Sequence, residues 1–275
     1  MKITAQQVNE LRKATGAGMM DCKNALVEAE GDMEKAVDIL RKKGQKVAAK
    51  RADREAGEGV VLAKTSDDKT FGAAIMINCE TDFVAKNQDF IDFVKSVLDF
   101  AVENRIKTAD ELKAANMDGH TVEEKVIEKT GVIGEKIQLG QYETVEGETV
   151  SFYIHPGNRI ATIAAFNKSG EAVETAGHDV VMQIAAMAPI AIDKDDVAED
   201  IIQRELEIGK EQARAEGKPE AMLEKIAMGK LGKFFKENTL LNQAFIKDSK
   251  KSVRDYLKDV DKDLTVIAFK RLALA

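Results

Sequence analysis

Residues 59–79, GVVLAKTSDDKTFGAAIMINC, carry the pattern that decides the fold of this chain. Two runs rich in aliphatic residues flank SDDK, whose residue types suit a β-turn. The stretch therefore predicts a hairpin with strands over 59–65 and 70–79. A polar corner follows, and the amphipathic run after it predicts a helix over 89–104. A hairpin followed by a helix is a building unit of α+β folds.

The same order of elements recurs further along the chain. Predicted strands over 149–155 and 159–166 flank an HPGN turn, and NKSG leads into a helix over 171–188. The repetition predicts an α+β protein with two related core subdomains, each an antiparallel sheet with helices. Two more strands, over 136–146 and 264–273, are expected to join the second sheet.

The first 44 residues predict a bundle of three short helices. Thr4 and Gln7 have the spacing of a capping box, and Gly31 and Gly44 are placed to end the second and third helices. The charged run 45–58 holds almost no large apolar residue, so it predicts a solvated helical linker.

A protruding antiparallel helical hairpin is predicted before the last strand. Residues 195–215 and 220–236 have helical patterns, and GKP at 217–219 forms the turn between them. The two arms are expected to meet along a narrow apolar seam, as in a coiled coil. The predicted seam consists of Val197, Ile201, Leu206, Ala213, Met222, Ile226 and Leu231.

These elements predict a division of the chain into domains. The bundle and its linker helix take 1–55, the first core subdomain 56–140 and the second 141–275, with the hairpin inserted at about 193–236. A chain of 275 residues is long enough for each part of the core to bury its own apolar side chains.

Composition points to a cytoplasmic protein. With 48 acidic and 41 basic residues the net charge is −7, which predicts no direct contact with nucleic acid. Cys22 and Cys79 lie too far apart in the sequence to suggest a disulfide framework, which fits a reducing compartment. No secretory signal and no run of about 20 apolar residues is present, so no membrane association is expected.

Motifs for enzyme chemistry are missing from the sequence. There is no GxxxxGK[ST], no GxSxG, no HExxH and no CxxC, and the three histidines lack metal-ligand spacing. The sequence predicts a binding protein that is not an enzyme and has no catalytic residue, cofactor or metal site. Two alternatives are a hydrolase that uses Cys79 with His155, and an RNA- or ribosome-binding adaptor that uses the basic linker Lys46–Arg54. Neither has motif support.

The corner ETDFVAKNQD leaves the position of Phe83 open. At 100° per residue Phe83 continues the apolar stripe of the helix after it, which predicts burial. Asn87, Gln88 and Asp89, however, are capping or turn residues, and any one of them can restart that helix. Thr81–Lys86 would then form a separate turn capped by Asp82, and Phe83 would point away from the core.

Met19 and Met20 raise the same question in the bundle. Adjacent residues cannot share one helix face, so at least one thioether is expected at the surface, where it would make an adaptable contact. Arg12 and Lys23 place positive charge beside them. Partial burial with ordinary surface charge is the alternative.

Five segments together resemble a known family. ELRKATGAGMMDCKNALVEAEGDMEKAVDILRKKG, EGVV, NCETDFVAKN, HPGNRIA and NQAFIKDSKKSV follow one another as in the bacterial translation elongation factor Ts family, and the match runs nearly end to end. The resemblance implies a guanine-nucleotide exchange factor that binds GDP-bound and nucleotide-free elongation factor Tu and promotes GDP release and GTP loading. It also implies that the N-terminal bundle is ubiquitin-associated-like.

The resemblance also implies roles for particular residues. Thr81, Asp82, Phe83 and Val84 would dislodge the partner's Mg²⁺, with Phe83 as the displayed wedge. The expected partner-binding residues are Arg12, Met19, Met20 and Lys23 in the bundle and His155, Ile246 and Lys247 in the core.

Departures from the family pattern are local. Ala161 stands where the family usually has glycine, Ala244 where proline is common, and the extra C-terminal module of some members is missing. In the family the helical hairpin can mediate self-association, which the resemblance extends to this chain as an expectation.

Overall fold

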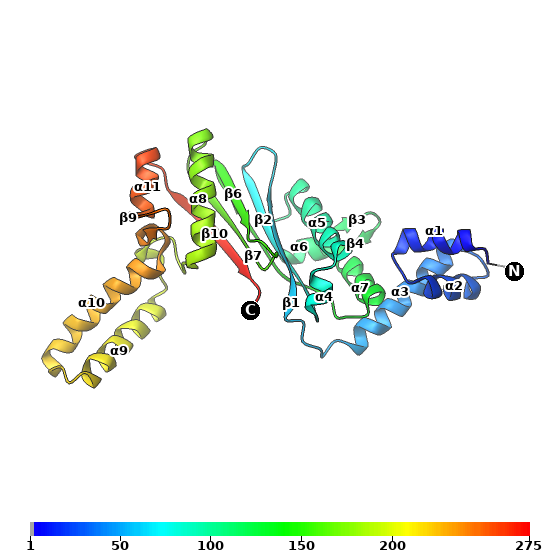
Figure 1. Ribbon diagram of the computed structural model, residues 1–275, viewed down its shortest axis with the longest axis horizontal. Helices are drawn as coiled ribbons and strands as arrows, with labels where there is room; N and C mark the ends of the chain where they lie inside the picture. The colour runs from blue at the N-terminus through cyan, green and yellow to red at the C-terminus, as the bar shows by residue number, and fades with distance from the viewer. Residues whose placement is uncertain (1–2) are drawn as a thin grey trace.

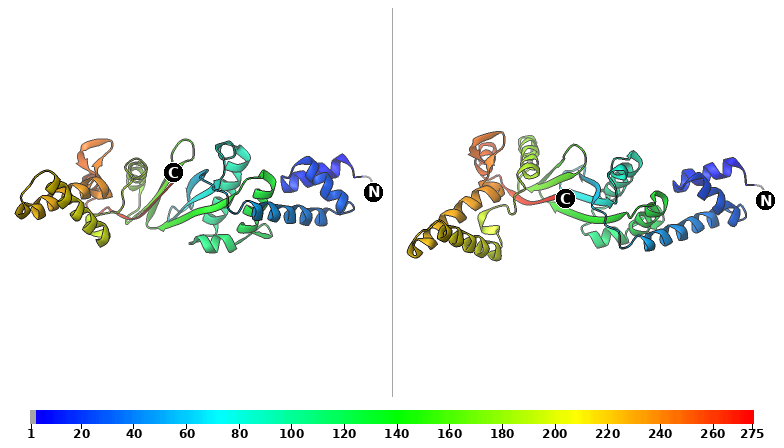
Figure 2. Two further views of the ribbon diagram at one scale, coloured as in Figure 1. Left: turned by 90° about the horizontal axis from the view of Figure 1, so that it is seen from below. Right: turned by 60° about the horizontal axis from the view of Figure 1, so that its bottom comes forward.

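The computed structural model describes residues 3–275 as an elongated α+β molecule. A helical bundle lies at one end, a helical hairpin at the other, and two sheets with their helices lie between them (Figure 1). The two further views show the same separation of bundle and hairpin (Figure 2). The partner-binding residues expected from the sequence are therefore spread along a long molecule.

The bundle consists of α1 (Ala5–Thr15), α2 (Met19–Glu28) and α3 (Met33–Lys50). The predicted capping box is present at α1, where the Thr4 hydroxyl accepts a hydrogen bond from the Gln7 N–H at 3.2 Å. Gly16 ends α1 with a φ of 70°, a conformation that glycine adopts without strain. The small core of the bundle holds Val8, Leu11, Ala17, Cys22, Ala25, Leu26, Ala29 and Ala36.

The prediction that Gly44 ends the third helix is wrong. Helix α3 continues to Lys50, and Gly44 is buried where α3 packs against α7 (Val122–Ile133). Gly44 and Gly131 face each other at this crossing, and a Cβ on Gly131 would overlap the Cα of Gly44. Because both residues are glycines without a side chain, the two helices can approach closely. The predicted linker 45–58, into which α3 extends, is mostly exposed as expected, and it joins the bundle to the core.

The first sheet has the order β1–β2–β5, with β1 (Glu58–Thr65), β2 (Phe71–Cys79) and β5 (Gln138–Glu146) antiparallel. The sequence predicted that the strand over 136–146 would join the second sheet, which is wrong. Tyr142 of β5 pairs with Ile75, and its hydroxyl donates to the Ile106 carbonyl at 2.7 Å inside the first core. These contacts fix β5 in the first sheet, so the predicted boundary at residue 140 falls inside a strand.

Helices cover the outer face of the first sheet. Helix α5 (Gln88–Glu103) buries Phe90, Val94 and Val97 against it. The short α6 (Ala109–Ala114), the two-residue strands β3 (Asn116–Met117) and β4 (His120–Thr121), and α7 complete this side.

The second sheet has the order β10–β7–β6, formed by β6 (Thr149–Ile154), β7 (Ile160–Phe166) and β10 (Val266–Ala273). The prediction that the last strand closes this sheet is confirmed. Helix α8 (Glu171–Met187) packs on β6 and β7, and α11 (Val253–Val260) packs on α8. Three short elements precede α11 in the chain: η2 (Leu240–Asn242), β8 (Ala244–Phe245) and β9 (Asp248–Ser252).

The two sheets share a core. Val61 and Met76 of the first sheet belong to the same buried cluster as Ile163 and Ala165 of the second. The neighbouring residues in β1 and β2 face α5, so both strands are buried on both faces. Apolar and polar residues therefore do not alternate along these strands. Ala161 is fully buried in this cluster.

The helical hairpin follows η1 (Lys194–Asp196) and consists of α9 (Glu199–Ala215) and α10 (Glu220–Asn238), as predicted. Met222 was expected in the seam but is exposed, because the adjacent Leu223 takes the inward position. The residues buried between the arms are Gly209, Ala213, Leu223, Ala227 and Leu231. Among residues 3–275, no helix is long and apolar enough to cross a membrane.

Candidate functional site

The polar corner contains a separate helical turn, α4 (Asp82–Ala85), between β2 and α5. Asn87 is the N-cap of α5 and begins the second helix, because its side chain accepts a hydrogen bond from the Asp89 N–H at 2.9 Å. The sequence expected Asp82 to cap the first turn, but the cap is Thr81, whose hydroxyl accepts from the Val84 N–H at 3.4 Å. Of the two readings left open, the separate turn is therefore the one observed.

Phe83 projects from this turn. Its side chain is 83% exposed, the highest value among the large apolar side chains in the described part of the chain. Val84 and Ala85, on the other sides of the turn, pack against the first core. Val84 and Ala85 thus anchor the turn, while most of the Phe83 side chain remains exposed.

Asp82 adds a negative charge beside the ring. Lys86 donates a hydrogen bond to the Asp82 carboxylate at 2.6 Å and holds the pKa of that carboxyl below its ordinary value. At neutral pH the corner therefore displays an ionised carboxylate next to an exposed aromatic side chain.

The bundle presents a second apolar surface. Met19 and Met20 are 63% and 62% exposed, whereas the sequence required only one of them to be at the surface. Together with Ile3, Val8, Arg12 and Lys23 they line a groove of about 620 Å³. Flexible thioethers with a positively charged rim suit the binding of an apolar protein surface that carries acidic groups.

His155 lies at the same end of the core as the corner. It is exposed in the β6–β7 turn, where its Nδ1 is 3.0 Å from the Tyr153 hydroxyl. Arg159, after this turn, forms an ion pair with Glu58, and Glu58 pairs with Cys79 just before α4. The fold thus brings His155 and Phe83 to one end of the two sheets.

Ile246 and Lys247 lie apart from that end. They form the β8–β9 turn beside α8 and α11, near the start of the hairpin (Figure 1). Ile246 is 44% exposed, and the Lys247 ammonium is 2.6 Å from the Asp179 carboxylate of α8. The bundle face, the corner and this turn are therefore three separate places, and only a partner of considerable size could contact all of them.

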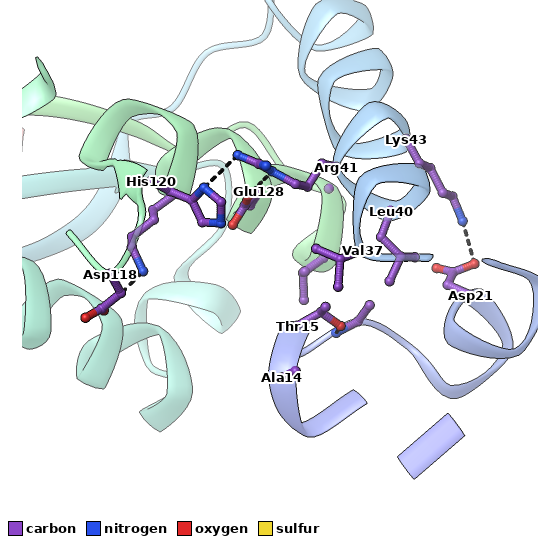
Figure 3. Close-up of a pocket in the computed structure, with 14 residues that line it drawn as sticks. Ala14, Thr15, Asp21, Val37, Leu40, Arg41, Lys43, Asp118, His120 and Glu128 are labelled. Carbon is purple, nitrogen blue, oxygen red and sulfur yellow. Dashed lines mark hydrogen bonds and ion pairs between the residues drawn. The ribbon is translucent and has the colours of Figure 1, made fainter. Parts of the chain in front are cut away.

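A further groove of about 390 Å³ separates the bundle from the core. Arg41 of α3 crosses it, with its Nε 2.7 Å from Glu128 and an Nη 2.9 Å from the Nδ1 of His120 (Figure 3). Nearby, Lys43 pairs with Asp21 within the bundle. Charged side chains of the bundle and of the core thus meet across this groove. Its basic groups Arg41 and Lys43 are already paired with carboxylates of this chain.

The structure gives no support to a Cys79 nucleophile. Cys79 is buried and donates to the Thr81 carbonyl at 3.2 Å. Burial, followed by the charges of Glu135 and Glu58, raises the pKa of the thiol to about 12. Catalytic cysteines have lowered pKa values, so this environment has the opposite effect. Within residues 3–275, no group of His, Cys, Asp and Glu side chains is arranged to hold a metal ion.

Alkylation tests this environment. The thiol pKa rises from an ordinary 9.0 to about 12, so at pH 8 native Cys79 should react with iodoacetamide about 1,000-fold more slowly than in the unfolded chain. Because the folded state holds this proton more tightly than the unfolded chain, the free energy of unfolding should fall as the pH rises from 9 toward 12. Peptide mapping by mass spectrometry measures the labelling of Cys79 separately from that of Cys22. Rapid labelling of Cys79 in the folded protein would contradict the assignment.

The α+β core displays Phe83 on an anchored turn, and the separate bundle carries a methionine-lined groove, so the molecule presents two exposed apolar surfaces of the kind that bind macromolecular partners. A family model described as Elongation factor TS matches residues 80–275. The chain is 55% identical to Elongation factor Ts of Christiangramia forsetii over 99% of both chains. It is 52% identical to Elongation factor Ts of Flavobacterium psychrophilum over 99% of this chain and 98% of that one. This chain belongs to the elongation factor Ts family.

Proposed function

We propose that this protein is the guanine-nucleotide exchange factor of elongation factor Tu. It binds the GDP-bound form in the cytoplasm, promotes GDP release and GTP loading, and makes or breaks no covalent bond. Membership of the family supports this role. The single structural observation that carries the mechanism is the exposed Phe83 on the anchored turn of the corner motif.

The corner acts as a wedge in this proposal. Mg²⁺ requires near-ideal octahedral geometry and is held in nucleotide sites by few protein ligands together with phosphates and water. An aromatic ring and a carboxylate inserted beside such a site displace the elements that hold the ion, and GDP then loses its metal-mediated contacts. Thr81 and Val84 hold the turn, while Asp82 and Phe83 enter the partner.

Two other surfaces hold the partner while the corner works. The ubiquitin-associated-like bundle docks through Met19, Met20, Arg12 and Lys23, and the core contributes His155, Ile246 and Lys247. This coupling is reciprocal: if the factor weakens nucleotide binding, nucleotide weakens factor binding by the same free energy. Incoming GTP can therefore release the factor from its partner.

The direct test is the release of a fluorescent GDP analogue from purified elongation factor Tu. Adding catalytic amounts of this protein in the presence of excess unlabelled GTP should raise the release rate in proportion to factor concentration until saturation. Omission of the protein gives the intrinsic rate as the control. Release at the intrinsic rate at every factor concentration would overturn the proposal. A competing role as an RNA-binding adaptor would instead require salt-sensitive RNA affinity.

A further inference from the structure

Two loops support the corner from behind. One joins β2 to α4 and contains Glu80 and Thr81, and the other joins α7 to β5 and contains Glu135 and Lys136. The Glu135 Oε2 accepts from the backbone N–H groups of Glu80 at 3.1 Å and Thr81 at 3.0 Å. Its Oε1 accepts from the Thr81 hydroxyl at 2.7 Å. Three donors at the base of the turn thus converge on one carboxylate.

The support is mutual. The Glu80 carboxylate accepts from the Lys136 N–H at 2.6 Å and from the Arg51 guanidinium at 2.8 and 2.9 Å. The Lys136 N–H, and after it Arg51, hold the pKa of Glu80 below its ordinary value. Arg51 is the C-cap residue of α3, so this pair also ties the end of the bundle's long helix to the corner.

The Thr81 hydroxyl shows how Glu135 controls the turn. It donates its proton to Glu135 and accepts from the Val84 N–H, so the carboxylate fixes the hydroxyl in the orientation that caps α4. A turn of four residues cannot hold itself, because isolated helices of this length do not form. Phe83 is 83% exposed and buries little surface that could orient it, so its direction follows that of the turn.

We propose that Glu135 is a positioning residue for exchange: it holds the Thr81–Val84 turn so that Phe83 already projects in the direction needed to enter the partner. This inference rests on the proposed function and deepens it. A wedge held in place before binding loses less conformational freedom when it inserts, so more of the contact energy is available to displace the metal. Glu135 itself lies behind the wedge and does not enter the partner.

The variant Glu135→Ala should lower the saturating rate of GDP release by about tenfold. It removes three hydrogen bonds to a carboxylate, each of which contributes to the free energy that holds the turn in place. The factor concentration giving half the maximal rate should change by less than about threefold, because the bundle groove remains. Glu135→Gln should be intermediate, since an amide offers one acceptor oxygen where the carboxylate uses two. A merely destabilised protein would not separate rate from affinity in this way.

A double-mutant cycle with Phe83→Ala makes the test specific. If Glu135 acts only by positioning Phe83, then Glu135→Ala should cause no further slowing in the Phe83→Ala background. The matched control is Glu111→Ala, which removes a carboxylate that accepts from two backbone N–H groups, at 3.1 and 3.2 Å, at the start of α6. This control should leave exchange unchanged.

Amide hydrogen exchange separates the inference from the proposed function. In Glu135→Ala the Thr81 and Val84 amides should lose protection while β2 and α5 keep theirs, whether or not the protein releases GDP. Unchanged protection at these amides, a wild-type release rate, or equal slowing in the Phe83→Ala background would each overturn the positioning role. If the unmodified protein fails to accelerate GDP release from elongation factor Tu while the amides respond as expected, the proposed function is wrong. The conclusion that Glu135 supports the turn then still stands.

Discussion

Replacing Phe83 with alanine should slow the saturating rate of GDP release from elongation factor Tu by about 30-fold, the equivalent of ~2 kcal/mol. Aromatic anchors of this kind commonly contribute that much when they are buried at an interface. The ring is 83% exposed in this structure, so nearly all of its surface is available to the proposed partner. Stopped-flow fluorescence with a labelled GDP analogue measures the effect.

The fold should not change in the Phe83→Ala variant. Because the side chain is 83% exposed, its loss should change the free energy of unfolding by less than about 0.5 kcal/mol. Urea denaturation followed by circular dichroism checks this expectation. The slowing can then be assigned to the missing wedge and not to a smaller folded fraction.

Phe152→Ala is the matched control. Phe152 is also exposed, but it lies within β6 on a shallow groove that Lys69 and Glu174 line, and it belongs to none of the proposed partner-binding surfaces. This variant should release GDP at the wild-type rate. If Phe83→Ala is as fast as the unmodified protein, or if both phenylalanine variants are equally slow, the corner is not the wedge.

Gly131→Ala is expected to have the largest effect on the structure. A Cβ at this position would overlap the backbone of Gly44, and backbone atoms cannot rotate away as a flexible side chain can. Overpacking of this type costs about 1–3 kcal/mol, so α3 and α7 should separate and the bundle should loosen from the core. Its small core leaves it little stability of its own, so it should unfold before the rest of the chain.

Limited proteolysis measures this loosening, with cleavage expected between residues 45 and 57. The opposite glycine provides a sharp control, because a Cβ on Gly44 would lie 3.5 Å from the Cα of Gly131 and from the Ile127 carbonyl oxygen, which is ordinary contact. Gly44→Ala should therefore be tolerated and gains helix propensity of up to about 1 kcal/mol. Equal protease resistance of Gly131→Ala and the unmodified protein would show that the crossing can relax.

The predictions from sequence succeeded where structure depends on neighbours along the chain. Caps, turns and periodicity placed the hairpins, the helices after them and the two-armed projection with bounds close to those observed. They failed for the strand over 138–146, because which sheet it joins depends on partners far away in the chain. The prediction that Gly44 ends a helix failed for a similar reason. Glycine is common at helix ends, and only the packing of α7 against α3 shows why Gly44 lies inside α3.

The candidate site divides in the same way. The sequence singled out the corner and the adjacent methionines as candidates, the resemblance added His155, and the local pattern limited Phe83 to two positions. It gave no sign of Glu135, which contacts Thr81 across 54 residues and belongs to no recognisable spacing. Contacts between distant loops leave no periodic signal, so local patterns cannot reveal them.

The sequence by itself determined the α+β class, the order of the helices and strands, and the family, because short-range propensities and a nearly continuous resemblance encode them. Only the tertiary structure decided that Phe83 is displayed. The ring's direction follows from the Thr81 cap, the packing of Val84 and Ala85, and the carboxylate behind the turn. Those forces act between segments that meet only when the chain is folded.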